Sequence, residues 1–214
     1  MLRDAPLRDV DEPTVAQVLL RALARGEGLA LHWSEGARQL RSRLVFLRQF
    51  DPEWPDAGEP ALADTIEAWL LPHLTGLRRR EQVEQLDPAT MLLDLLTWQQ
   101  RLELDRLAPT HVAVPTGSNI RIDYGDPESP VLAVRLQELF GLAETPRIAA
   151  GRVPLTLHLL SPARRLVQVT RDLAGFWRTS YFEVRRDLRG RYPKHEWPDD
   201  PLAARPTRRA RPRR

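Results

Sequence analysis

The sequence contains no cysteine and only one lysine among its 32 basic residues. The absence of cysteine excludes a disulfide framework and zinc sites that use thiolate ligands. No stretch reaches the roughly 18 consecutive apolar residues that indicate a membrane-spanning helix. Residues 1–6 lack the apolar segment of a signal peptide. We therefore expect a cytoplasmic protein that does not insert into membranes.

A phosphate-binding loop is missing as well. That loop follows the pattern G-x-x-x-x-G-K-[ST], in which glycine precedes the lysine and a hydroxyl residue follows it. The only lysine, Lys194, instead follows Pro193 and precedes His195. We therefore expect no ATP hydrolysis, no catalytic residue, and no bound cofactor or metal in this chain.

Charge is distributed unevenly along the 214 residues. Residues 1–110 contain 13 arginines and 18 acidic residues, which gives a balance of −5. Residues 111–214 contain 19 basic and 11 acidic residues, a balance of +8. Genomic composition explains a preference for arginine over lysine, but it does not explain why the two halves differ in sign. A basic second half is expected where a protein faces a polyanion.

Residues 1–108 are predicted to form a helical region. Asp11 or Glu12 can cap a first helix, because apolar residues after them repeat at i, i+3 and i+4. Ser34 is a second N-cap, and Asp87 followed by Pro88 is a third. The first expected helix ends at Gly26, and the second begins after Ser34. A third covers residues 61–71 before Pro72, and a fourth runs from residue 88 to about Leu107.

After Pro109 apolar and polar residues alternate, which is the pattern of β-strands. Residues 109–201 are therefore predicted to form a small mixed or antiparallel β domain that ends in helices, so the fold class is α+β. Residues 202–214 carry six arginines with little apolar surface to bury, and we expect a basic, disordered tail. The expected strands cover residues 112–114, 120–124, 131–134, 153–160 and 166–170, and helical segments follow from Asp172 to Arg189 with a break near Thr179.

Several segments of this second half resemble one known family. The most specific is GRYPKHEWPDDP at 190–201, and further blocks are VPTGSNIRIDYG at 114–125, VLAVRLQELFG at 131–141, LHLLSP at 157–162 and DLAGFW at 172–177. In this order they are similar to the C-terminal region of the bacterial HrpB family of DEAH-box-type ATP-dependent helicases. Residues 37–43 and 69–74 match more loosely. The signature residues of the most specific segment are Gly190, Tyr192, Pro193, Lys194, His195, Trp197, Pro198, Asp200 and Pro201.

This resemblance implies a function for the chain. Helicases of the family carry two ATPase domains upstream, and those domains bind ATP and Mg. The chain has neither domain, so it looks like an accessory region that docks on motor domains in cis or in trans. The resemblance implies nucleic acid, either RNA or DNA, as a partner. The alternative is a protein–protein interaction module that recruits a protein partner and does not touch nucleic acid.

The basic residues near the C-terminus are the candidate contacts to nucleic acid. Nine cations lie within residues 164–194, against three acidic residues. Phosphate groups attract such a cluster, although an ordinary solvated helix face has the same composition. The candidate residues are Arg164, Arg165, Arg171, Arg178, Arg185, Arg186, Arg189, Arg191, Lys194, Arg208 and Arg209.

Two further interpretations concern the residues between these cations. The interleaved aromatic residues at 176, 177, 181, 182 and 192 can stack on unpaired bases, but their spacing is also that of a hydrophobic core, which we favour. His195, Glu196 and Asp199 suggest a metal or acid–base site only weakly, because ligands must converge in space. We expect His195 to lie on Trp197, and Asp199 or Asp200 to accept backbone hydrogen bonds in a turn.

Overall fold

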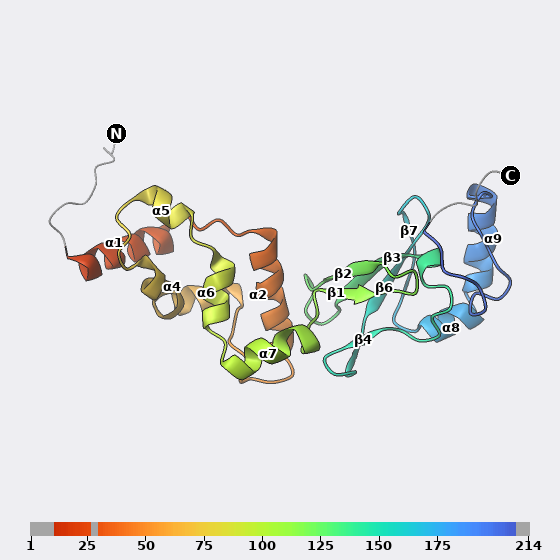
Figure 1. Ribbon diagram of the computed structural model, residues 1–214, viewed down its shortest axis with the longest axis horizontal. Helices are drawn as coiled ribbons and strands as arrows, with labels where there is room; N and C mark the ends of the chain where they lie inside the picture. Colours follow the sequence, from red (N-terminus) through yellow and green to blue (C-terminus); the bar gives the residue numbers. More distant parts are fainter. Residues whose placement is uncertain (1–10, 27–29, 209–214) are drawn as a thin grey trace. The chain divides into compact units, whose positions relative to one another are not determined.

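The computed structural model describes residues 11–26 and 30–208 (Figure 1). The chain forms two compact units, which divide between Glu103 and Leu104. Helices make up the described part of the first unit, and a mixed sheet with flanking helices makes up that of the second. The expected α+β class is thus confirmed. None of the described helices combines the length and the apolarity that crossing a membrane requires.

The first two helices begin at the expected capping residues. Helix α1 (Glu12–Arg25) starts where the Asp11 carboxylate accepts a 3.1 Å hydrogen bond from the Thr14 amide, and it ends at Gly26. Gly26 has a φ of +65°, the left-handed conformation that closes many helices. Helix α2 (Glu35–Arg48) starts where Ser34 Oγ accepts a 3.1 Å hydrogen bond from the Ala37 amide.

The expected helix at 61–71 is instead a pair of helices. Helix α3 (Glu59–Asp64) ends at Thr65, whose hydroxyl donates to the carbonyl of Ala61 at 2.7 Å. Helix α4 (Ile66–Leu74) continues through Pro72, which we expected to stop it. Proline removes one backbone donor, and Pro72 lies in the last turn, where only that one helical bond is lost.

The expected helix from Pro88 to Leu107 is also divided. Helix α5 (Arg80–Glu84) precedes it, and α6 (Pro88–Asp94) and α7 (Trp98–Leu107) replace it. Thr97 starts α7 because its hydroxyl accepts a 3.2 Å bond from the Gln100 amide, while the Gln100 side chain accepts a 2.9 Å bond from the Thr97 amide. This reciprocal pair is a capping box, and it stabilises a new helix start.

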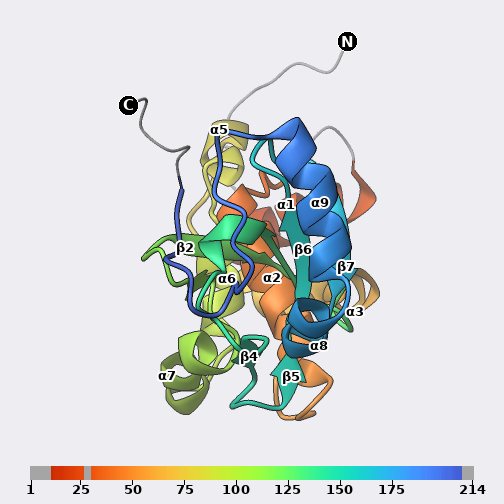
Figure 2. The same ribbon diagram turned by 90° about the vertical axis from the view of Figure 1, so that its right-hand side faces the viewer.

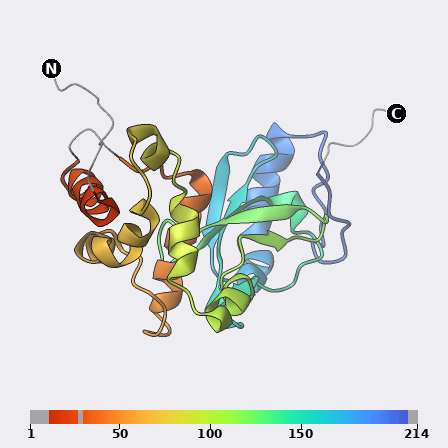
Figure 3. The same cartoon turned by 60° about the vertical axis from the view of Figure 1, so that its left-hand side comes forward.

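The helices of the first unit pack together (Figure 3) and bury a set of apolar side chains. Helix α4 contacts α1 and α6, and α6 contacts α2. Leu44, Phe46, Leu70 and Leu92 are all fully buried among these helices. Removing such apolar surface from water is the main stabilising contribution to the fold of a helical unit.

The second unit contains a five-stranded sheet with the order β1-β2-β3-β6-β7. Neighbouring strands are antiparallel except β3 and β6, which are parallel and pair Val131 with Thr156. A short 3-10 helix, η1 (Leu136–Glu138), follows β3, and a two-stranded sheet precedes β6. The strands are β1 (His111–Ala113), β2 (Asn119–Asp123), β3 (Val131–Arg135), β4 (Arg147–Ile148), β5 (Val153–Pro154), β6 (Thr156–Leu160) and β7 (Leu166–Thr170).

Helices α8 (Leu173–Arg178) and α9 (Tyr181–Arg191) complete the second unit, and the break between them is where we expected it. Figure 2 shows α9 running alongside β6 and β7. Aromatic side chains join the helices to the segment after η1, because the Tyr181 ring lies 5.3 Å from Trp177 and 6.4 Å from Phe140 between centroids. Trp177 Nε1 also donates to the carbonyl of Leu142 at 2.8 Å.

Residues 202–208 differ from the expected disordered tail. Asp200 accepts backbone hydrogen bonds from Leu202 and Ala203, as expected for a turn. The chain then lies over η1, where the Thr207 amide donates to the carbonyl of Gln137 at 3.0 Å. Sequence composition missed this segment because backbone hydrogen bonds, rather than apolar side chains, hold it. Residues 209–214 lie outside the described residues.

Candidate nucleic-acid interface

The tight turn between β6 and β7 presents two of the candidate cations. The Arg164 amide donates to the carbonyl of Ser161, and the Ser161 amide donates to the carbonyl of Arg165, both at 2.8 Å. Arg164 has a φ of +60°, which is uncommon for a residue with a side chain. Both arginine side chains are exposed, so this turn directs two adjacent positive charges into solvent.

The outer face of α9 presents two more. Arg186 and Arg189 are exposed, and they follow Phe182 at the i+4 and i+7 positions, so the three residues share one side of the helix. Phe182 is 51% exposed, whereas Leu188 is buried on the opposite side. Arg178, at the end of α8, is exposed near the start of α9.

A contact between Tyr192 and Ser161 brings these segments together. The Tyr192 hydroxyl lies 3.5 Å from Ser161 Oγ, so the end of α9 lies beside the turn that carries Arg164. Exposed Lys194 follows two residues later. Within the described residues, the side chains of five cations from these segments have no hydrogen bond or ion pair. We call them the cationic surface: Arg164, Arg165, Arg186, Arg189 and Lys194.

Other candidate cations are engaged within the protein. Arg171 donates to the carbonyl of Glu128 at 2.9 Å, and Arg208 donates to the carbonyl of Thr116 at 2.7 Å. Arg191 forms an ion pair with Asp187 at 3.1 Å, one turn earlier on α9. Arg209 lies outside the described residues. These positions are therefore not equivalent to the free cations of the turn and of α9.

Arg185 fixes the signature segment against α9. Its Nε donates to the carbonyl of Trp197 at 2.9 Å, and its Nη2 lies 2.6 Å from Asp199. Trp197 is 7% exposed, and its indole N–H donates to the carbonyl of Tyr192 at 2.9 Å. The segment 190–201 thus folds back on the helix, with Trp197 and Pro201 buried.

We expected His195 to lie on Trp197, but its ring contacts Tyr192 instead. The two rings meet edge to face with centroids 6.3 Å apart, because the turn after α9 brings the His195 amide onto the Tyr192 carbonyl. Burial, followed by the positive charge of Arg135, lowers the pKa of His195. The imidazole is therefore neutral at pH 7 and adds no charge beside Lys194.

The aromatic residues between the cations divide into two groups. Phe176, Trp177 and Tyr181 are buried in the core of the second unit, and they have no face open to a base. Phe182 keeps half of its surface exposed and lies on the cationic side of α9. In the described parts of the chain, no three His, Asp or Glu side chains converge as a metal site would require.

Sequence reasoning missed a buried polar network around Glu138, whose side chain is 5% exposed. Its carboxylate accepts hydrogen bonds from Ser118 Oγ at 2.8 Å, from Arg135 Nε at 2.8 Å and from Thr116 Oγ1 at 3.2 Å. Burial raises the pKa of Glu138, but these bonds and the charge of Arg135 outweigh burial, so the net pKa is lowered. The network joins residues of two segments that resemble the HrpB family, 114–125 and 131–141. Their presence in such segments was the one feature of the sequence that could have indicated the network.

Comparisons with known proteins relate this chain to the C-terminal regions of ATP-dependent helicases. A family model for the C-terminal region of ATP-dependent helicases, HrpB_C, matches residues 69–201. The ATP-dependent RNA helicase HrpB of Escherichia coli K12 is 46% identical over 209 residues, which are 96% of this chain and 26% of that protein. The chain therefore spans about a quarter of the length of this relative.

Solved structures show the same similarity. The crystal structure of the E. coli DExH-box NTPase HrpB matches with a TM-score of 0.85 and 46% identity, over 98% of this chain and 26% of that chain. A crystal structure of the E. coli DEAH/RHA helicase HrpB matches with a TM-score of 0.72 and 42% identity, over 92% of this chain and 25% of that chain. The chain belongs to the HrpB_C family of ATP-dependent helicase C-terminal regions.

Proposed function

We propose that this chain is the C-terminal accessory region of an ATP-dependent helicase and that its second unit holds a nucleic-acid strand. The observation that carries the proposal is the cationic surface: five exposed side chains, free of partners within the described residues, from two segments that Tyr192 and Ser161 join. Phosphate groups bind such cations by releasing counterions, without regard to base sequence.

The proposal places the chemistry elsewhere. Motor domains, in cis or in trans, bind ATP and Mg and hydrolyse the nucleotide, while this cytoplasmic region guides the strand. Support comes from the sequence, which lacks a phosphate-binding loop. The purified chain should therefore show no ATP turnover above a buffer blank, and turnover by this chain alone would contradict the proposal.

Salt titration tests the strand-holding role. Binding of a fluorescent single-stranded oligonucleotide should weaken as salt rises. The logarithm of the binding constant should fall linearly with the logarithm of the salt concentration, with a slope of about 0.7 per phosphate contacted, which we call the salt slope. The double variant R164Q/R165Q should lower that slope by about 1.4, since two contacts are lost. RNA and DNA oligonucleotides of the same sequence, measured side by side, show which strand the region prefers.

A matched control uses another adjacent pair of exposed arginines. Arg78 and Arg79 lie in the first unit, and R78Q/R79Q removes the same net charge from the chain. This variant should bind with the slope of the unmodified protein. Equal losses from the two pairs would mean that net charge alone attracts the strand, and the assigned surface would then be wrong.

A second candidate function is docking of a protein. Leu166 and Val169 on the edge strand β7 are 54% and 46% exposed, and Phe182 is 51% exposed. The unpaired backbone groups of an edge strand can bind an added strand, and exposed apolar side chains beside them can pack on it. If this function holds instead, L166S/V169S should abolish association with the motor domains, while R164Q/R165Q leaves oligonucleotide binding unchanged.

A further inference from the structure

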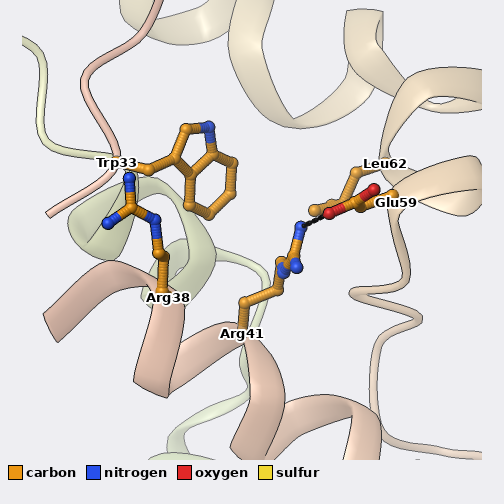
Figure 4. Close-up of a pocket in the computed structure, with 5 residues that line it drawn as sticks. All are labelled: Trp33, Arg38, Arg41, Glu59 and Leu62. Atoms are coloured by element: carbon orange, nitrogen blue, oxygen red, sulfur yellow. Dashed lines mark hydrogen bonds and ion pairs between the residues drawn. The ribbon is translucent and has the colours of Figure 1, made fainter. Parts of the chain in front are cut away.

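A hollow in the first unit has the lining of a ligand site. It lies between the start of α2 and α3, has a volume of about 330 Å³, and is lined by Trp33, Arg38, Arg41, Glu59 and Leu62. Figure 4 shows Trp33 and Arg38 on one side, Glu59 and Leu62 on the other, and Arg41 between them. The volume is at the lower end of the roughly 300–1,000 Å³ found for small-ligand sites.

The start of α2 positions three of these side chains. Trp33 directly precedes the cap Ser34, and its half-buried indole borders the hollow. Arg38 and Arg41 are three residues apart on the helix, so they lie on the same side, one turn above the other. Leu62, which is 5% exposed, adds an apolar wall from α3.

The charges of the hollow do not cancel. Arg41 Nη1 lies 2.7 Å from Glu59 Oε1, and the Arg41 guanidinium carbon lies 5.6 Å from the centre of the Trp33 ring. The Arg38 side chain is exposed, and its guanidinium has no hydrogen bond or ion pair within the part of the chain that the structure describes. One positive charge is therefore left over, and an anion has a free guanidinium to bind.

We propose that this hollow binds one nucleotide of a single strand. Arg38 binds the phosphate, and the base stacks on the open part of the Trp33 indole, against the apolar wall of Leu62. Aromatic rings beside cations bind unpaired bases in this way without reading their sequence. The site extends the proposed strand-holding function to the first unit, and it does not need the cationic surface of the second.

Two variants of the full chain separate the two contacts, with a fluorescein-labelled octauridylate as the probe. W33L should weaken binding by about five- to 150-fold, the range for one stacked base, and should leave the salt slope unchanged. W33F keeps a ring and should retain most of the affinity. R38Q should lower the salt slope by about 0.7, because one phosphate contact is lost.

Matched controls lie in the same unit. Trp98 is 74% exposed, and Arg79 is exposed, so W98L and R79Q change the same residue types outside the hollow and should bind as the unmodified protein does. If W33L fails to fold by circular dichroism, W33F and R38Q decide the outcome. Adenosine monophosphate and inorganic phosphate, added separately as competitors, should displace the oligonucleotide only weakly.

Three outcomes would overturn the proposal. Unchanged binding by both W33L and R38Q removes the site altogether, and a loss confined to R164Q/R165Q in the same experiment shows that the cationic surface acts without it. A loss with R38Q alone shows a phosphate contact with no stacked base. Displacement by the free nucleotide as strong as by unlabelled octauridylate shows a mononucleotide site rather than a strand site.

Discussion

The hydroxyl of Tyr181 donates a 2.8 Å hydrogen bond to the backbone carbonyl of Pro198. This bond connects the first residue of α9 to the signature segment that follows the same helix. Burial raises the pKa of Tyr181 well above its ordinary value, so the phenol keeps its proton throughout the range in which the protein can be studied. The phenol therefore remains able to donate this bond at every pH used to study the protein.

We predict that Y181F lowers the free energy of unfolding by about 0.5–1.5 kcal/mol, the net contribution of one hydrogen bond. The loss should be constant between pH 5 and pH 9, because the phenol does not ionise there. Urea unfolding at several pH values measures it. Y192F is the control: its hydroxyl is 3.5 Å from Ser161 Oγ, so it should lose less, and an equal loss would contradict this assignment.

Glu138 should make the second unit sensitive to acid. Its pKa is lower in the folded chain than in the unfolded chain, so its ionisation stabilises the fold above the unfolded value of about 4.3. That contribution is lost as the pH falls from about 5 through the folded pKa. E138Q should lower the free energy of unfolding at pH 7 by about 1–3 kcal/mol.

The pH dependence of that difference provides the check. Unfolding of the E138Q and unmodified chains should be compared at steps from pH 7 to pH 3. The difference in unfolding free energy between the two chains should become smaller below about pH 5, because the Glu138 carboxyl of the unmodified chain is then neutral as well. A difference that stays constant down to pH 3 would show that shape, rather than charge, gives Glu138 its role.

Arg185 and Arg189 lie four residues apart on α9 and should behave in opposite ways. R185Q removes bonds to Trp197 and Asp199, so we predict a loss of about 1–3 kcal/mol in unfolding free energy with an unchanged salt slope of oligonucleotide binding. R189Q should change stability by less than about 0.5 kcal/mol and lower the slope by about 0.7. Thermal unfolding and salt titration of both variants test the contrast.

Gly175 allows the Asp172 carboxylate to cap α8. The Gly175 amide donates to Asp172 Oδ1 at 2.8 Å, and a Cβ added at Gly175 would overlap with the same carboxylate. We predict that G175A lowers stability by about 1 kcal/mol through loss of the cap. In a D172A background the same change should be neutral or stabilising, because alanine favours helix over glycine. Calorimetry of the four proteins measures this coupling, and additive losses would refute it.

Local signals in the sequence predicted much of the fold. Ser34 and Asp87 each cap the helix that we assigned to them, and Asp11 rather than Glu12 caps the first helix, since a cap depends on a few neighbouring residues. The change from helical to alternating patterns located the strands for the same reason. The helix break at Thr97 was also readable in principle, because Thr97 and Gln100 have the spacing of a capping box.

Features that depend on distant residues were not predictable in this way. The bond from Thr207 to Gln137 and the burial of Glu138 arise only when segments far apart in sequence meet. Among the candidate cations, composition alone did not separate Arg185, which is committed to Asp199, from exposed Arg189. The Trp33 hollow escaped notice because its walls come from α2 and α3, and neither helix signals a ligand.

The parallel pairing of β3 and β6 has a consequence for how the second unit is made. The β1–β2 and β6–β7 hairpins can each form from neighbouring residues, but the seam between Val131 and Thr156 needs a long intervening chain to return. Until β6 pairs with β3, Leu132 and Val134 therefore have a neighbouring strand, β2, on only one side. We therefore expect the two hairpins to form before the parallel pairing that closes the centre of the sheet.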